Sequence, residues 1–86
     1  MSNYMIIMLN NSLNQIYELF GNLITIDDVD TRNLLIVGII VESKILIEII
    51  DGTKLNQDLT SCEIKSTKII KERLVDLIDR CLIILE

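Results

Sequence analysis

With 86 residues, half of them hydrophobic and 3% aromatic, the chain is expected to form a single domain (1–86) with an aliphatic core. Its 13 acidic and 8 basic residues give a net charge of −5, which disfavours free-standing nucleic-acid binding because phosphates are repelled. The sequence has no histidine, no Cys-x-x-Cys pair and no phosphate-cradling glycine motif, so we expect no catalytic residue, metal site or cofactor, and no enzyme.

The first predicted element is a helix at about residues 12–21. Apolar residues recur through this region at spacings of three and four, as one face of a helix requires. Ser12 and Gln15 fit a capping box, and Gly21 lies where a helix would stop. The pattern leaves open whether the helix extends back through residues 4–9 or whether that segment is extended.

From about residue 22 onward, β-favouring residues predict strands. Residues 23–26 indicate a short strand, and the carboxylates of Asp27, Asp28 and Asp30 then indicate a turn. We interpret this acidic cluster as a solvated turn, because it lacks the ligand spacing of a calcium-binding loop.

The middle of the chain predicts a β-hairpin. Residues 34–41 form a β-branched run with an internal glycine, which is typical of a strand that is buried on both faces and bends. Residues 45–50 repeat the pattern, and Glu42-Ser43-Lys44 would make a tight connection between the two strands. A polar loop is expected from about residue 51 to residue 68, with an irregular strand near residues 59–64.

The last segment allows two interpretations. Periodicity favours a helix, because one stripe recurs at helical spacing: Ile70, Leu74, Leu77, Cys81 and Leu85. The alternative is a strand at residues 73–78, a turn at Asp79 and Arg80, and a second strand at residues 81–85, since the sequence Cys-Leu-Ile-Ile-Leu favours β structure.

This order of elements resembles the Sm and Sm-like (LSm) protein family over residues 12–86. Residues 19–26 and 34–41 are similar to the first Sm motif, in which a glycine precedes one strand and another bends the next. Residues 77–84 are similar to the second motif, with Cys81 in place of its turn glycine. The resemblance implies a mainly β fold, a small five-stranded barrel with an N-terminal helix. The alternatives are an α+β fold, with a C-terminal helix packed on a β-hairpin, and an OB-type small barrel.

The resemblance implies a structural subunit of an RNA-processing or RNP-assembly complex that acts through protein–protein strand pairing. Its partners would be other protein subunits, in a homo- or hetero-oligomer. We place five residues at the interface: Ile45, Ile47, Leu77, Ile83 and Leu85. The loop Glu42-Ser43-Lys44 lacks the asparagine that reads a base, so RNA would be contacted only within a complex, through Lys44 and Arg80. The alternative function is a homodimeric α+β interaction module without RNA binding.

The remaining features indicate an intracellular protein, cytoplasmic or nuclear. Cys62 and Cys81 are expected to be reduced thiols with packing roles. No signal peptide is indicated, and the longest apolar run, residues 34–41, is far shorter than the ~20 residues that span a bilayer. We therefore expect no membrane association.

Overall fold

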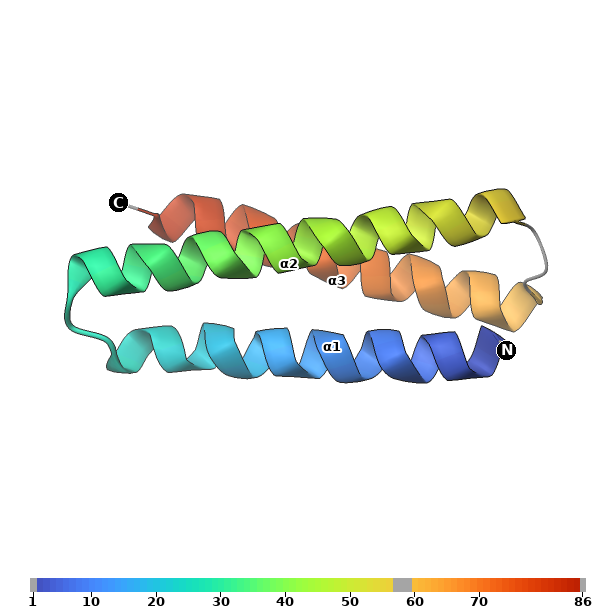
Figure 1. Cartoon of the computed structure of the whole chain (residues 1–86), viewed down its shortest axis with the longest axis horizontal. Helices are drawn as coiled ribbons and strands as arrows, with labels where there is room; N and C mark the ends of the chain where they lie inside the picture. Colours follow the sequence, from blue (N-terminus) through green and yellow to red (C-terminus); the bar gives the residue numbers. More distant parts are fainter. Residues whose placement is uncertain (1, 57–59, 86) are drawn as a thin grey trace.

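The computed structural model describes residues 2–56 and 60–85, with side chains from 4–52 and 60–85. Within these residues the chain forms three α-helices, a short 3₁₀ turn and no strand. The elements are α1 (Ser2–Asn22), η1 (Leu23–Thr25), α2 (Val29–Asn56) and α3 (Ser61–Ile84). The helices run side by side in alternating directions and form a rod of 45 × 18 × 14 Å (Figure 1).

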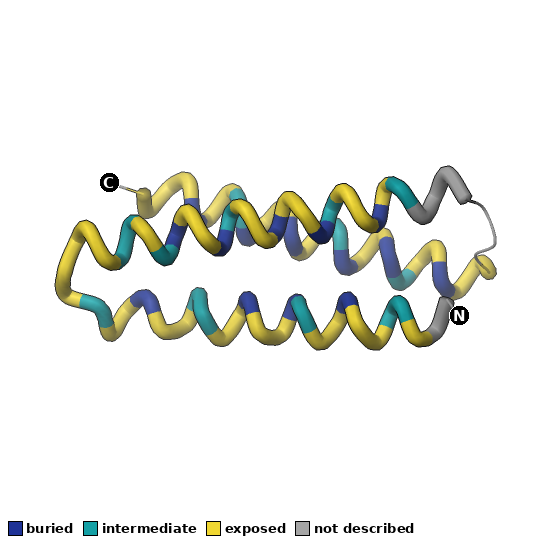
Figure 2. Tube along the Cα trace, in the orientation of Figure 1, coloured by how far each residue is buried: buried dark blue, intermediate teal, exposed yellow. Residues whose placement is uncertain are grey.

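Each helix contributes one row of buried residues, in which the spacing alternates between three and four, and Leu23 of η1 continues the row of α1 seven residues after Ile16. An average spacing of 3.5 keeps these side chains on one seam and favours a left-handed winding of the helices around each other. The buried positions face the common axis of the three helices (Figure 2). The rows are Leu9, Leu13, Ile16 and Leu23; Ile36, Ile39, Ser43, Leu46 and Ile50; and Glu63, Thr67, Ile70, Leu74, Leu77 and Cys81.

Short polar motifs start α2 and α3. The Asp28 carboxylate accepts hydrogen bonds from the hydroxyl of Thr31 at 2.5 Å and from its N–H at 2.9 Å, and these bonds lower the pKa of Asp28. Asp27 and Asp28 therefore lie between helices, whereas Asp30, predicted in the same turn, belongs to the first turn of α2. At α3, the Thr60 hydroxyl accepts from the N–H of Glu63 at 3.2 Å, and the Glu63 carboxylate accepts from the N–H of Thr60 at 2.8 Å. This reciprocal pair is a capping box.

The mainly β prediction is wrong. Residues 34–41 and 45–50, expected as two strands, are consecutive stretches of α2, and Glu42-Ser43-Lys44 is helix interior rather than a hairpin turn. Residues 23–26 form η1 and the start of the connection to α2. The five-stranded barrel, the hairpin of the α+β alternative and the OB-type barrel are therefore all absent from the described residues. Packing along the core seam outweighs the β propensity of isoleucine and valine.

The predicted helices are present with different bounds. α1 includes residues 12–21 but begins at Ser2, so residues 4–9 are helical and Ser12 lies inside the helix rather than at its cap. The helical interpretation of the last segment is confirmed by α3, which buries all of the predicted stripe except Leu85. The expected loop at residues 51–68 is mostly the end of α2 and the start of α3, while residues 57–59 lie outside the described residues.

One polar group in the core lacks a hydrogen bond. The Ser43 hydroxyl is fully buried at the middle of α2 and has no partner among the described residues. Burying an unpaired hydroxyl costs about 1–3 kcal/mol, and alanine is also the better helix former. We therefore expect Ser43→Ala to raise the free energy of unfolding by about 1 kcal/mol in urea titrations.

The control for this substitution is Ser12→Ala, at a partly exposed position of α1. It makes the same chemical change in a helix interior and should alter stability by less than about 0.5 kcal/mol. A loss of stability in Ser43→Ala would show that the buried hydroxyl is hydrogen-bonded, which would contradict its unpaired state.

Candidate protein-interaction face

The most unusual feature of the molecule is that α2 is apolar on its outward side as well as on its buried side. Its outward residues recur at spacings of three, four, four and four, and they keep between 38% and 75% of their surface exposed. We call this set the outer stripe: Leu34, Val37, Val41, Ile45 and Ile49. A helix that is apolar all round is normally covered all round, so the outer stripe is a candidate docking surface.

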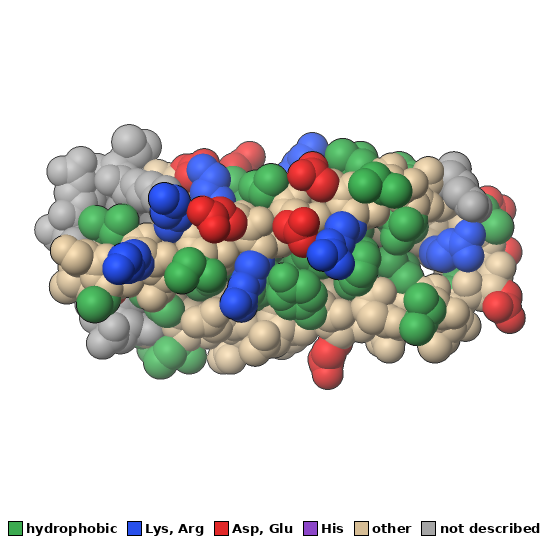
Figure 3. Space-filling model, turned by 180° about the vertical axis from the view of Figure 1, so that it is seen from behind, with side chains coloured by type: hydrophobic (Ala, Val, Ile, Leu, Met, Phe, Trp, Pro, Cys, Tyr) green, Lys and Arg blue, Asp and Glu red, His purple; other side chains and the backbone are tan. Residues whose placement is uncertain are grey.

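The other two helices do not share this feature to the same degree. Most of the exposed face of α1 carries polar, mainly uncharged side chains: Asn10, Asn11, Asn14, Gln15 and Glu18. In the view from behind, Lys, Arg, Asp and Glu side chains are spread along the rod and interspersed with hydrophobic ones (Figure 3). Positive and negative side chains alternate on that face and form no continuous basic patch. It therefore lacks the concentrated positive charge that nucleic-acid-binding surfaces carry.

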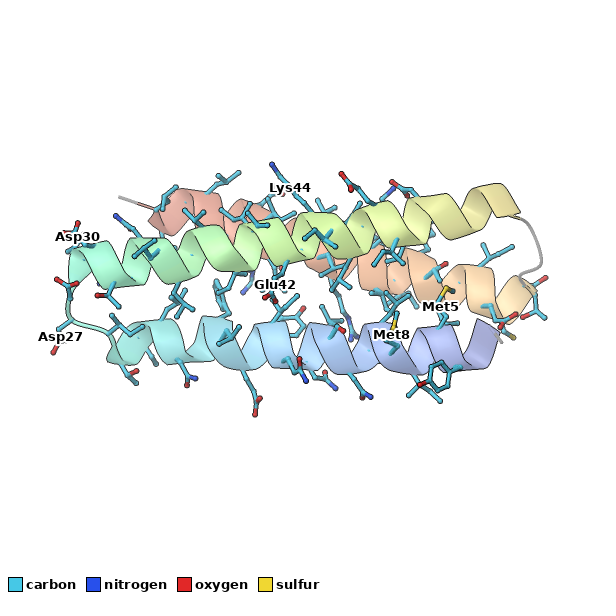
Figure 4. All side chains as sticks on the ribbon, in the orientation of Figure 1. Met5, Met8, Asp27, Asp30, Glu42 and Lys44 are labelled. Atoms are coloured by element: carbon cyan, nitrogen blue, oxygen red, sulfur yellow. The ribbon has the colours of Figure 1, made fainter. Side chains whose placement is uncertain are left out.

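Charged residues flank the outer stripe on both sides. Glu42 points from α2 toward α1, whereas Lys44 points away from α1 (Figure 4). On the side of α3, Asp51 accepts a hydrogen bond from the Lys71 ammonium at 2.7 Å, and this ion pair links α2 to α3. An apolar strip with a polar rim is the usual anatomy of a protein–protein interface.

Gly38 lies within the outer stripe, and nothing inside the chain requires a glycine there. A Cβ atom added at this position would meet no atom within 4 Å. Glycine in a helix interior costs roughly 0.5–1 kcal/mol relative to alanine, so its presence at an open position is unfavourable for the isolated chain. A glycine on a helix surface does allow another chain to approach the backbone closely.

The five residues predicted at the interface fall on different surfaces. Ile45 belongs to the outer stripe, Ile47 packs partly buried against the core, and Leu77 lies inside the core with 1% of its surface exposed. Ile83 and Leu85 lie at the far end of α3, where they are 81% and 37% exposed. The structure therefore brings no more than two of them to any one surface.

The two residues predicted to contact RNA are on different helices. Lys44 is exposed beside the outer stripe of α2. Arg80 is exposed on α3, and its Nε lies 2.9 Å from the Asp76 carboxylate of the same helix. The barrel that would have brought them to one inner face is absent from the described residues.

The sequence prediction includes only Ile45 of the outer stripe, because the β-branched run of residues 34–41 favours one strand buried on both faces. The signal that finds it is the alternating three-and-four spacing from Ile36 to Ile50. Once those positions are assigned to the core seam of a helix, Leu34, Val37 and Val41 must lie on the opposite side.

A second apolar surface lies at the end of the rod near the C-terminus. It surrounds a hollow of about 430 Å³ that η1, the connection before α2, the first turn of α2 and the last turn of α3 form together. Its lining residues are Leu23, Ile24, Ile26, Asp27, Arg32, Ile83 and Ile84. This hollow is open and is separate from the outer stripe, so Ile83 belongs to a different surface from Ile45.

The two cysteines have contrasting environments. Cys62 is exposed near the start of α3, whereas Cys81 is fully buried in the core. Burial raises the pKa of the Cys81 thiol because it disfavours the charged thiolate.

A raised pKa in the folded state means that the unfolded chain loses this proton first as pH rises. The contribution of Cys81 to stability is therefore intact below its ordinary pKa of about 8.5 and declines above that value. We expect the free energy of unfolding of the wild-type chain to fall more steeply above this pH than that of Cys81→Ala. Equal slopes in the two proteins would contradict the prediction.

Other candidate chemistry is limited. Asp27 lies in the connection before α2 and Asp30 in the first turn of α2, at the same end of the rod (Figure 4). The described residues include no cluster of three His, Cys, Asp or Glu side chains that could hold a metal ion. Among the described helices, none combines the length and apolar character needed to cross a membrane.

Comparisons with protein-family models, curated proteins and solved structures give no match to this chain.

Proposed function

We propose that the chain is a non-enzymatic interaction module that binds another protein through the outer stripe of α2. The observation that carries the proposal is the apolar outward side of α2, opposite a core row that is itself complete. The described residues contain no strand, so the contact would be helix against helix rather than strand pairing. Amphipathic helices commonly bind through such rows of residues three and four apart.

Burial of apolar surface, rather than charge, would stabilise such a contact. The five residues of the outer stripe together expose about 430 Å². Covering this surface would remove apolar area from water at about 25 cal/mol per Å², before the costs of association are subtracted. The net charge of −5 and the Arg80–Asp76 ion pair favour a protein partner over RNA.

A photo-crosslinking amino acid at position 41 tests the proposal in cells that express the chain. We expect covalent adducts from position 41 and none from the control position, Asn14, on the polar face of α1. Adding Ile45→Glu should abolish the adducts, because a carboxylate within an apolar interface is costly to desolvate. Adduct yields that are equal at positions 41 and 14, or zero at both, would contradict the proposal.

Val41→Glu separates binding from folding. Val41 is 49% exposed, so we expect this substitution to change the free energy of unfolding of the isolated chain by less than about 0.5 kcal/mol, at concentrations too low for association. A large loss of stability under those conditions would show that position 41 belongs to the core rather than to a docking surface.

A further inference from the structure

We infer that the protein bound by the outer stripe is a second copy of this chain, packed α2 against α2 in opposite directions about a two-fold axis near Val41. This inference rests on the proposed function and specifies its partner. Four observations carry it: the symmetry of the stripe, the open position of Gly38, the position of Glu48 and the exposed area.

The outer stripe is nearly symmetric about Val41. Val37 and Ile45 lie four residues to either side, and both are about half exposed apolar residues. A two-fold interface requires a surface that complements itself, because each copy contributes the same patch. Reversed helices centred on Val41 would place Val37 of one copy beside Ile45 of the other, and Val41 beside its own counterpart.

Gly38 has a role in this arrangement that it lacks in the isolated chain. In reversed pairing it lies next to Ile45 of the second copy, and the missing side chain leaves room for that isoleucine. The residues Val37, Val41, Ile45 and Ile49 form a ridge with four-residue spacing. Two such ridges pack into each other's grooves at a crossing angle near −50°, and an axis near Val41 places the closest approach at that residue.

The position of Glu48 favours the reversed direction over the parallel one. Glu48 lies on the same side of α2 as the stripe, seven residues from Val41. Parallel helices would bring the two copies of Glu48 alongside each other, whereas reversed helices separate them by about 20 Å at 1.5 Å per residue. Reversal also sets the two helix dipoles in opposition, which is the favourable arrangement.

The exposed area is sufficient for a dimer. The rod has 5846 Å² of accessible surface, whereas a compact protein of its mass is expected to have about 5,200 Å². Two outer stripes at about 430 Å² each, together with the exposed rim residues Lys44 and Glu48, reach the ~1,000 Å² that specific interfaces require. We therefore expect a reversible dimer rather than an obligate one.

Sedimentation equilibrium of the full chain tests the mass. We expect the average molecular mass in solution to approach twice the 9.9 kDa of one chain as the protein concentration rises from micromolar toward millimolar. Val41→Glu should raise the dissociation constant of the dimer at least tenfold, because the two-fold axis would bring two carboxylates together. Asn14→Glu should leave the dissociation constant at the wild-type value. Circular dichroism of both variants verifies that their helices remain.

Disulfide trapping tests the position of the axis. In a Cys62→Ser background, Val41→Cys should form a disulfide-linked dimer under air with a copper–phenanthroline catalyst, because its two copies meet. Leu34→Cys, seven residues away on the same stripe, should not, because reversed helices hold its copies about 20 Å apart. Efficient trapping at Leu34 instead of Val41 would overturn the arrangement.

The two proposals fail in different ways. A chain that stays monomeric at near-millimolar concentration, with no trapping at Val41, overturns the second-copy inference. The proposed function survives that result if photo-crosslinking at position 41 joins the chain to a different protein. If position 41 forms no adduct at all, both proposals fail.

Discussion

Lys44→Pro is expected to destabilise the chain by about 3 kcal/mol or more, because residue 44 lies at the centre of α2. Proline would remove the hydrogen bond from the N–H of residue 44 to the carbonyl of Ile40, and its ring would clash with that carbonyl. Little of the loss would come from the lysine itself, since its side chain is exposed. Urea unfolding followed by circular dichroism at fixed protein concentration measures the effect, because any association also shifts apparent stability.

Two controls isolate the backbone effect. Lys44→Ala removes the same charge while keeping the N–H, and should change stability by less than about 0.5 kcal/mol. Val29→Pro places proline at the first residue of α2, where the N–H has no partner in the helix, and should be tolerated. A tolerated proline at residue 44 would contradict a continuous α2 and restore the turn that Glu42-Ser43-Lys44 predicted.

The contrast between residues 34–50 and 70–81 explains why part of the fold could be predicted. In α3 the apolar residues are separated by charged ones, so the helical period stands out and the core residues Ile70, Leu74, Leu77 and Cys81 are found from sequence. In α2 the outward positions are also apolar, so the helical period is hidden within an unbroken β-branched run. The feature that makes α2 a candidate docking helix is the one that obscures its structure.

A polar residue could have resolved the ambiguity in α2. Ser43 occupies the seam between Ile39 and Leu46, at the spacing that the core row requires, yet it was interpreted as part of a turn. Short polar residues are common in turns, and only the packing of α1 and α3 around this position shows that it is buried. The outer stripe could not be predicted for the same reason, because the outward side of α2 can be assigned only after its buried side is known.

The core seam itself gives the second large effect. Leu74 is fully buried in α3, and we expect Leu74→Ala to lower the free energy of unfolding by about 3 kcal/mol, from lost burial and the cavity left behind. For a domain of this size that is a large part of a total of roughly 5–10 kcal/mol, so the unfolding midpoint should fall by more than about 10 °C.

Leu82→Ala is the matched control, because it makes the same substitution in the same helix at a residue that is 56% exposed. Both variants gain the same helix propensity from alanine, so the difference between their unfolding free energies reports burial alone. We expect Leu82→Ala to cost less than about 0.5 kcal/mol in the same urea titration. Equal losses would mean that α3 buries a different face, and the alternating row from Thr67 to Cys81 would then not be the seam that holds the three helices together.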